Sequence, residues 1–282
     1  MTKIQWCDKT WNPIIGCSKI SEGCSNCYAI DQAWRNRAIA LNRPPEARGR
    51  LRGYVDAVKK EDHGINWTGD LVLLPEALEI PFEVKKPTTW FVNSMGDLFH
   101  ENIPYDWIDQ VMETMLATYK HRYMVLTKRP ERMADYCQQI RQRLGLPSNP
   151  KFPIPNLWLG VSIENNRVSK RLSGLMKTNC PNKFLSCEPL LETLHLAQYP
   201  EFHCIKLVIA GGESGANARI CNLEWAVELA MQCIDAGVPF FFKQAGSNVQ
   251  WQGVKLKFTT KHGDVLEELP KELQPILKRC RF

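Results

Sequence analysis

The strongest constraint on the fold is a repeated alternation of short apolar runs with longer amphipathic runs. From residue 90 onward, apolar runs end near residues 93, 127, 161, 186, 210 and 243, at intervals of about 25–35 residues. Between them, residues 105–119 and 223–236 carry apolar side chains at helical spacing. Such alternation is typical of βα units. With one strand before Cys17, it predicts an α/β fold of about seven strands, a partial or near-complete parallel (β/α) barrel of TIM type.

Two parts of the chain interrupt this rhythm. Residues 42–87 contain many Pro and Gly residues, which favour turns. We expect them to form an irregular insertion in a barrel that comprises residues 1–245. We expect residues 246–282 to be a small C-terminal extension, with a hairpin that turns at His262–Asp264 and a basic tail at 278–281.

Composition favours a protein of a reducing compartment. The 282 residues are 44% hydrophobic, enough for a substantial core. No apolar run approaches the roughly 20 residues of a membrane span, and the N-terminus lacks the apolar region of a signal peptide. We therefore expect a cytoplasmic protein without a membrane partner. Eleven cysteines in such a chain favour a metal site and buried thiols over disulfides.

Three cysteines are clustered in residues 10–28. Cys17, Cys24 and Cys27 have the spacing C-x6-C-x2-C, and clustered thiolates suit an iron–sulfur cluster or a soft metal. A [4Fe–4S] cluster commonly has four cysteine ligands, so three ligands leave one iron open to a substrate or cofactor. An alternative is a zinc site with Cys7 as fourth ligand, although nine residues separate Cys7 from Cys17.

Polar residues are concentrated where the predicted strands end. In a parallel barrel, these ends form the active site. The residues are Asn93, Ser94, Gly96, Asp97, Thr127, Lys128, Arg129, Ser162, Glu164, Asn165, Cys187, Glu188, Gly211, Gly212, Glu213, Ser214, Lys243 and Gln244. The pattern predicts a polar ligand at the barrel mouth. The alternative is that loops are polar because they face water.

The cysteine loop is followed by SMGDLF, LTKRP, GVSIEN, SCEPL, AGGESG and FKQAG. Over nearly the whole chain, this order resembles a phage and bacterial family assigned to the radical S-adenosylmethionine (SAM) superfamily. More distantly it is similar to spore photoproduct lyase, which repairs a thymine lesion in DNA. The superfamily's usual spacing is C-x3-C-x2-C, so the six residues between Cys17 and Cys24 are a departure. Asn26 stands where the superfamily has an aromatic residue.

The resemblance implies a [4Fe–4S] cluster held by Cys17, Cys24 and Cys27, which cleaves bound SAM to a 5′-deoxyadenosyl radical. It also implies an electron donor of flavodoxin or ferredoxin type. The residues it implies for SAM binding are Ser94, Gly96 and Asp97 at the amino group, Lys128 or Arg129 at the carboxylate, and Ser162 and Glu164 at the ribose. The alternative for Lys128 and Arg129 is a solvated helix start. Gly212 and Glu213 are further candidates, because adjacent glycines let the backbone approach a ligand closely, and the alternative is a tight turn.

Three further residues are candidates for catalysis. Cys187 could donate a hydrogen atom to a product radical, or it could be a small buried side chain of the core. Glu188 and Lys243 follow the fifth strand and the last strand, respectively. Their positions predict that both lie at the barrel mouth.

Residues 35–60 carry eight Lys and Arg residues and two acidic residues. Such a segment could contact DNA or RNA, and the alternative is a solvated surface loop. The leading hypothesis is a radical SAM enzyme that acts on a nucleobase or nucleic acid. The alternatives are a zinc-stabilised nucleic-acid-binding protein and a structural or redox-sensing cluster. Dinucleotide-binding, P-loop and zinc-peptidase motifs are absent from the sequence.

Overall fold

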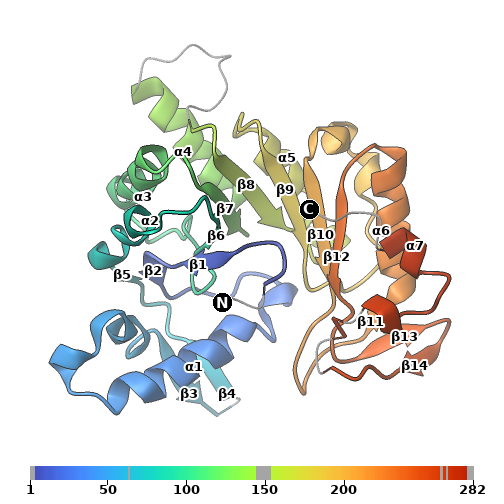
Figure 1. Ribbon diagram of the computed structural model, residues 1–282, viewed down its shortest axis with the longest axis horizontal. Helices are drawn as coiled ribbons and strands as arrows, with labels where there is room; N and C mark the ends of the chain where they lie inside the picture. Colours follow the sequence, from blue (N-terminus) through green and yellow to red (C-terminus); the bar gives the residue numbers. More distant parts are fainter. Residues whose placement is uncertain (1–3, 63, 144–153, 261–262, 265, 278–282) are drawn as a thin grey trace. The chain divides into compact units, whose positions relative to one another are not determined.

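The computed structural model describes residues 4–62, 64–143, 154–260, 263–264 and 266–277 (Figure 1). Its main sheet has seven strands in the order β1-β6-β7-β8-β9-β10-β12. They are β1 (Lys9–Trp11), β6 (Thr89–Val92), β7 (Arg122–Thr127), β8 (Leu157–Ser162), β9 (Lys183–Cys187), β10 (Leu207–Gly211) and β12 (Phe240–Gln244). Every strand pair in this sheet with a described register is parallel. The predicted α/β class and parallel sheet of about seven strands are thus confirmed.

Among the described strands, β1 and β12 are the two ends of this order, as in a partial parallel barrel. Several strands are buried along their whole length, as β9 and β10 show. Strands covered on both faces have near-continuous apolar sequences, which explains why these runs were visible in the sequence. The helices of the βα units are α3 (Tyr105–Ala117), α4 (Pro130–Arg143), α5 (Arg171–Met176) and α6 (Leu223–Asp235).

The chain divides into two compact units. Unit 1 comprises Met1–Ile20 and Cys27–Trp158, and unit 2 comprises Ser21–Asn26 and Leu159–Phe282. The division therefore passes through β8 and through the cysteine loop. The predicted boundary at residue 245 does not coincide with it and stays a prediction. Within the described ranges, no helix has both the length and the apolar character needed to cross a membrane.

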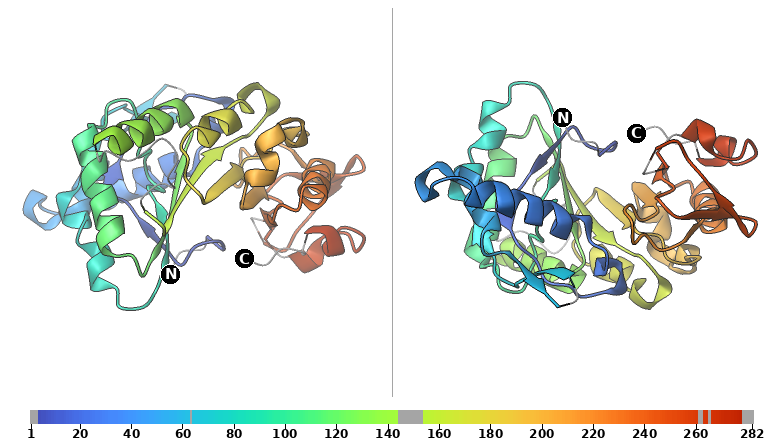
Figure 2. Two further views of the ribbon diagram at one scale, coloured as in Figure 1. Left: turned by 90° about the horizontal axis from the view of Figure 1, so that it is seen from above. Right: turned by 90° about the horizontal axis from the view of Figure 1, so that it is seen from below.

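In unit 1, α3 and α4 lie side by side (Figure 2). The Tyr136 hydroxyl donates to Asp109 at 2.8 Å between the two helices. The apolar stripe of α3, which includes Trp107 and Val111, is buried, as expected of an amphipathic helix. Pro130 is the first residue of α4, where its missing N–H costs no hydrogen bond.

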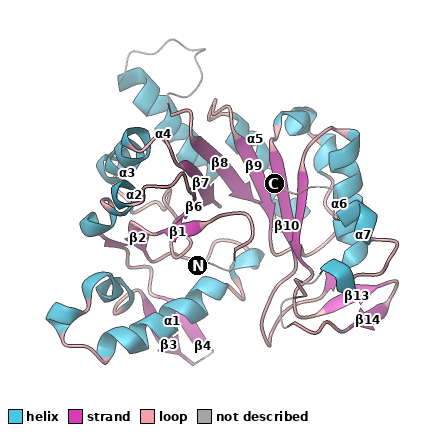
Figure 3. Cartoon of the chain, in the orientation of Figure 1, coloured by secondary structure: helices cyan, strands magenta, loops and turns pink. Residues whose placement is uncertain are grey.

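Residues 42–87 form short elements joined by loops (Figure 3). They are the 3-10 helices η2 (Pro45–Ala47), η3 (Gly49–Tyr54) and η4 (Pro75–Ala77), the strands β3 (Val58–Glu61), β4 (Gly64–Trp67) and β5 (Val72–Leu73), and α2 (Ile80–Glu83). Their buried side chains, such as Tyr54 and Trp67, share a core with Ile30 and Ala33 of α1 (Tyr28–Leu41). The short strand β2 (Ile14–Ile15) pairs with β5. The insertion is therefore built onto the helix that follows the cysteine loop.

Unit 2 contains a hairpin that the sequence did not single out. Strands β13 (Val249–Trp251) and β14 (Val254–Leu256) are antiparallel. Gln252 and Gly253 between them have φ of 50° and 75°, and two positive φ angles suit a type I′ turn. The predicted turn includes His262, which lies outside the described residues, as does the predicted basic tail at 278–281. The remaining elements are η1 (Glu22–Cys24), η5 (Asn166–Val168), η6 (Leu196–Gln198), η7 (Pro200–Cys204), β11 (Cys221–Asn222), η8 (Leu266–Glu268) and α7 (Gln274–Leu277).

Candidate functional site

The cysteine loop begins in unit 1, where its backbone lies against the loop after β6. Gly16 has φ of 110° and forms a parallel bridge with Gly96, and its N–H donates to the carbonyl of Met95 at 3.1 Å. A Cβ on Gly96 would lie 2.9 Å from the carbonyl oxygen of Gly16. The sequence-predicted Gly96 is thus needed for the close approach that fixes the residue before Cys17.

Ser94 links the same loop to both ends of the cysteine segment. Its hydroxyl donates to Asn12 Oδ1 at 3.2 Å, and the Met95 N–H donates to the same oxygen at 3.0 Å. The carbonyl of Ser94 accepts from the Tyr28 hydroxyl at 3.1 Å. These bonds hold the loop after β6 against residues that precede Cys17 and follow Cys27.

Asp97 is 5% exposed, and both of its carboxylate oxygens accept hydrogen bonds. Oδ1 accepts from the Phe99 N–H at 3.0 Å and the Thr127 hydroxyl at 2.7 Å. Oδ2 accepts from Arg129 Nη1 at 2.9 Å and, at 3.4 Å, from the N–H of Lys128. The carboxylate is therefore a brace between the ends of β6 and β7. The predicted contact of Asp97 with the SAM amino group stays a prediction.

Arg129 is 8% exposed and spreads its guanidinium over three side-chain oxygens. Besides Asp97, it donates through Nε to Glu101 at 2.6 Å and through Nη2 to Ser18 Oγ at 2.7 Å. Burial alone would lower its pKa, but the neighbouring carboxylates outweigh burial and raise it. Arg129 is therefore a fixed positive charge beside the start of the cysteine loop.

Burial raises the pKa of the Cys17 thiol to about 12, and the charge of Asp97 adds to this effect. The charge of Arg129 and its hydrogen bond to Cys17 act in the opposite direction. Cys27, at the N-cap of α1, also interacts electrostatically with Cys17. A helix N-terminus favours negative charge, whereas at Cys17 burial outweighs the stabilising charge of Arg129.

The middle of the cysteine loop, Ser21–Asn26, belongs to unit 2 and is anchored on Glu164. The Ser21 hydroxyl donates to Glu164 Oε1 at 2.5 Å, and Arg171 Nη1 donates to Oε2 at 2.7 Å. Glu164 is 0% exposed. A Cβ on Gly23 would lie 2.2 Å from Glu164 Cγ, so glycine is required at this position.

Glu213 and Glu22 give this segment further attachments. Asn26 Nδ2 donates to Glu213 Oε2 at 2.9 Å, and Arg219 Nη2 donates to Oε1 at 2.6 Å. Burial alone would raise the pKa of Glu213, but these hydrogen bonds hold it below its usual value. Glu22 accepts from Arg167 at 2.9 Å. The Asn26 amide thus has a specific structural partner.

Glu188 and Lys243, two of the catalytic candidates, form an ion pair. Lys243 Nζ lies 2.9 Å from Glu188 Oε1, and their side chains are 22% and 16% exposed. Cys187 is 0% exposed, and burial raises its pKa well above the usual value. The structure therefore joins Glu188 to Lys243 at the strand ends. Cys187 is fully buried, and its predicted role as a hydrogen-atom donor stays a prediction.

Two other predicted residues make contacts within unit 2. A Cβ on Gly212 would lie 2.0 Å from the carbonyl oxygen of Ala245, so this glycine accommodates the chain's own backbone. Ser162 is 5% exposed, and its carbonyl accepts from Arg171 at 2.9 Å. The Gly212 contact accounts for a glycine at that position, whereas any residue could offer the carbonyl at 162. The predicted contacts of both residues with SAM stay predictions.

The sequence did not single out Ser18, Gly23, His100 or Glu101. Each makes a contact described above or hydrogen-bonds to such a residue, as His100 does to Ser18 at 2.8 Å. Burial, followed by the charge of Arg129, lowers the pKa of His100. The one available signal was the position of His100 and Glu101, shortly after the SMGD sequence.

The loop carries three cysteine thiols, the type of ligand that iron–sulfur clusters use. Cys17, Cys24 and Cys27 are free thiols, and Cys17 is close enough to Cys27 for their charges to interact. Within the part of the chain that the structure describes, no group of three or more His, Cys, Asp or Glu side chains is arranged to hold a metal ion. Cys24 belongs to unit 2, and the other two cysteines belong to unit 1.

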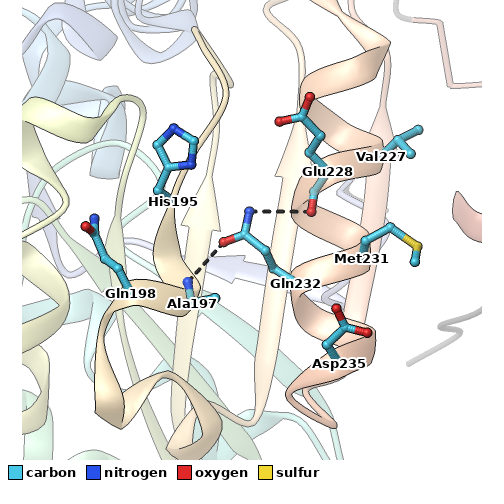
Figure 4. A pocket seen from close by; sticks show the side chains of 8 residues that line it. All are labelled: His195, Ala197, Gln198, Val227, Glu228, Met231, Gln232 and Asp235. Atoms are coloured by element: carbon cyan, nitrogen blue, oxygen red, sulfur yellow. Dashed lines mark hydrogen bonds between the residues drawn. The ribbon is translucent and has the colours of Figure 1, made fainter.

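A surface pocket of about 520 Å³ lies elsewhere in unit 2, between η6 and α6 (Figure 4). His195, Met231 and Asp235 contribute to its lining. Gln232 crosses between the two elements, because its Oε1 accepts from the Ala197 N–H at 3.0 Å. None of the residues predicted from the sequence to form the site lines this pocket.

Fold and site together define an α/β protein with a partial parallel barrel and a three-cysteine loop braced by buried carboxylates. The family model described as "Protein of unknown function (DUF5131)" matches residues 1–272. The chain therefore belongs to this family. No curated protein and no solved structure matches the chain.

Proposed function

We propose that the chain is a radical SAM enzyme whose [4Fe–4S] cluster is held by Cys17, Cys24 and Cys27. The observation that carries the proposal is the bracing of a free-thiol loop, at Gly16–Gly96 in unit 1 and at Ser21–Glu164 in unit 2. When bound, the cluster supplies the electron that cleaves SAM to methionine and a 5′-deoxyadenosyl radical. The proposal includes the TIM-type partial barrel, a flavodoxin- or ferredoxin-type electron donor and a cytoplasmic location.

The contacts within unit 1 favour Lys128 over Arg129 as the partner of the SAM carboxylate. Arg129 already donates to Asp97, Glu101 and Ser18. Lys128 is half-buried and next to it in the chain, and an ammonium group can serve as a point charge for a carboxylate. In this arrangement Asp97 is a positioning residue, because it holds the Arg129 guanidinium in place.

Within unit 2, Glu164 and Glu213 both accept hydrogen bonds from the cysteine loop. Glu164 fixes Ser21 and lies against Gly23, while Glu213 fixes Asn26. Both carboxylates are therefore proposed to hold the loop around Cys24 in place. The part-exposed pair of Glu188 and Lys243 is the better candidate to face a substrate, because neither side chain is fully buried.

We propose a nucleobase or nucleic acid as the substrate, on the strength of the basic segment 35–60. Some of its cations have internal partners: Arg37 Nε donates to the carbonyl of Val55 at 2.8 Å, and Arg52 pairs with Glu76. Arg43, Arg50 and Lys60 are among its exposed residues. These three exposed cations are therefore the residues to replace in a test of nucleic-acid binding.

Replacing Arg43, Arg50 and Lys60 together with Gln should weaken binding to DNA or RNA and flatten its salt dependence. The slope of log K against log salt should fall in magnitude by about 0.9 for each phosphate that the variant no longer neutralises. The matched control replaces Lys85, Lys86 and Lys120, which are also exposed in unit 1. Equal slopes for the two triple variants would remove the nucleic-acid part of the proposal.

The enzyme itself is tested with reconstituted, dithionite-reduced protein and SAM under anaerobic conditions. We expect slow release of 5′-deoxyadenosine, which stops without the reductant. Lys128→Met should raise the SAM concentration needed, whereas the exposed control Lys120→Met should not. If the reduced protein neither binds SAM nor changes its cluster spectrum when SAM is added, the enzyme proposal fails and a structural cluster takes its place.

A further inference from the structure

The hydroxyl of Ser18, the residue after Cys17, receives two hydrogen bonds. Arg129 Nη2 donates to Ser18 Oγ at 2.7 Å. His100 Nε2 lies 2.8 Å from the same oxygen. His100 Nδ1 accepts from the backbone N–H of Asn102 at 3.2 Å. A ring nitrogen that accepts carries no hydrogen, so in the neutral ring Nε2 carries it and donates to Ser18.

These two donors determine where the Ser18 hydrogen can point. A hydroxyl oxygen has two acceptor positions and one O–H donor. Arg129 and His100 occupy both acceptor positions, and neither can accept the hydrogen in return. Among the described residues, no side chain or backbone group accepts from Ser18 Oγ. The O–H of the half-buried Ser18 is therefore directed away from Arg129 and His100. Arg129 also hydrogen-bonds to the Cys17 thiol, which places the Ser18 hydroxyl beside Cys17.

The surroundings hold this donor rigidly. His100 is 1% exposed and Arg129 is 8% exposed. Arg129 is itself fixed by Asp97 at 2.9 Å and Glu101 at 2.6 Å. The buried, hydrogen-bonded Arg129 and His100 limit the rotation of the hydroxyl between them.

We propose that Ser18 is a positioning residue that donates its hydroxyl hydrogen to the sulfur-rich group held at Cys17. The inference rests on the proposed function, because it takes the cysteine loop to bind an iron–sulfur cluster. Hydrogen bonds to cluster sulfur atoms are among the factors that set the reduction potential. They stabilise the reduced form, which carries more negative charge. Ser18 thereby makes the cluster easier to reduce.

The test is a redox titration of the reconstituted cluster, monitored by electron paramagnetic resonance in the absence of SAM. Ser18→Ala should shift the midpoint potential to a more negative value than in the wild type. Ser25→Ala is the matched control, because Ser25 is an exposed serine of the same loop. It should leave the potential unchanged.

A second pair of variants covers the case in which Ser18→Ala fails to assemble the cluster. Ser18→Thr and Ser18→Val have nearly the same shape and differ in the hydroxyl, so the valine variant should have the more negative potential. Equal potentials within both comparisons would overturn the role of Ser18 and leave the proposed function standing. A wild-type protein that takes up no iron would overturn both.

Discussion

Each unit contains a buried ion pair between an arginine and a carboxylate, and the two pairs touch the cysteine loop through opposite charges. In unit 1, Arg129 lies 2.9 Å from Asp97, and the arginine donates to Ser18 of the loop. In unit 2, Arg171 lies 2.7 Å from Glu164, and it is the carboxylate that accepts from Ser21 of the loop. Both carboxylates follow a strand of the parallel sheet.

The two ion pairs therefore differ in what they can do for the cysteine loop. The charges of Asp97 and Arg129 both act on Cys17, in opposite directions, so the unit 1 pair can influence the chemistry of the loop. A carboxylate neutralised by Arg171 contributes no comparable field, but it fixes the backbone near Cys24 because Gly23 lies directly against it. We therefore infer that the unit 1 pair has an electrostatic role and that the unit 2 pair has a structural one.

The largest expected effect comes from removing either arginine. Arg129→Ala and Arg171→Ala each leave a buried carboxylate without its counter-charge, which should lower the free energy of unfolding by about 3–5 kcal/mol. Urea unfolding at neutral pH measures this loss. Arg167→Ala is the control, because Arg167 is 78% exposed in its pair with Glu22 and should cost about 0–1 kcal/mol. If Arg171→Ala were as mild as this control, Glu164 would not be a structural anchor.

Gly23→Ala should have a smaller effect that is confined to unit 2. The added Cβ would lie 2.2 Å from Glu164 Cγ, and the fully buried, ion-paired Glu164 has little room to move. We expect a loss of about 1–3 kcal/mol in the free energy of unfolding, as for other overpacked sites. Ser25→Ala, at an exposed position two residues away, should be close to neutral. Equal stability of both variants would mean that the loop does not need its close contact with Glu164.

The smallest effect is a pH dependence at Glu213. Its folded pKa is held below the usual 4.5, so its carboxylate stabilises the fold above that pH. This stabilisation should be lost as the pH falls through the folded pKa. The wild type should therefore exceed Glu213→Gln by about 1 kcal/mol at neutral pH, and the difference should vanish in acid. Thermal unfolding of both proteins across this range measures it.

Glu101 of unit 1 provides the comparison for this pH effect. Its pKa is also lowered, because its bond to Arg129 outweighs its burial. However, its side chain is 58% exposed, and exposed pairs contribute little. Glu101→Gln should therefore change the pH profile less than Glu213→Gln. The reverse order would show that Asn26 and Arg219 do not hold Glu213 as the structure indicates.

The sequence predicted the parallel sheet well because its strands are buried. The apolar runs that became β7 and β10 have no polar face to obscure them. The sequence did not single out the hairpin at Gln252–Gly253, and the predicted turn at His262–Asp264, part of which lies outside the described residues, stays a prediction. Turn position depends on which strands pair, and that is a property of the folded chain.

The sequence predicted which residues of the candidate site lie at strand ends. It did not predict which groups those residues contact. The sequence placed Glu188 and Lys243 at the same mouth, and they form an ion pair. It did not reveal that Gly212 faces the carbonyl of Ala245. Nor did it single out Ser18, whose role depends on side chains that reach it from two later loops. Contacts of this kind follow from side-chain reach in three dimensions, which spacing along the chain does not encode.

The central claim is that the loop binds an iron–sulfur cluster, and metal analysis of anaerobically prepared protein tests it most directly. The account predicts about four iron and four sulfide per chain, as a [4Fe–4S] cluster requires. Cys17→Ala, Cys24→Ala and Cys27→Ala should each lose them, and Cys7→Ala should keep them. Stoichiometric zinc without iron would contradict the account.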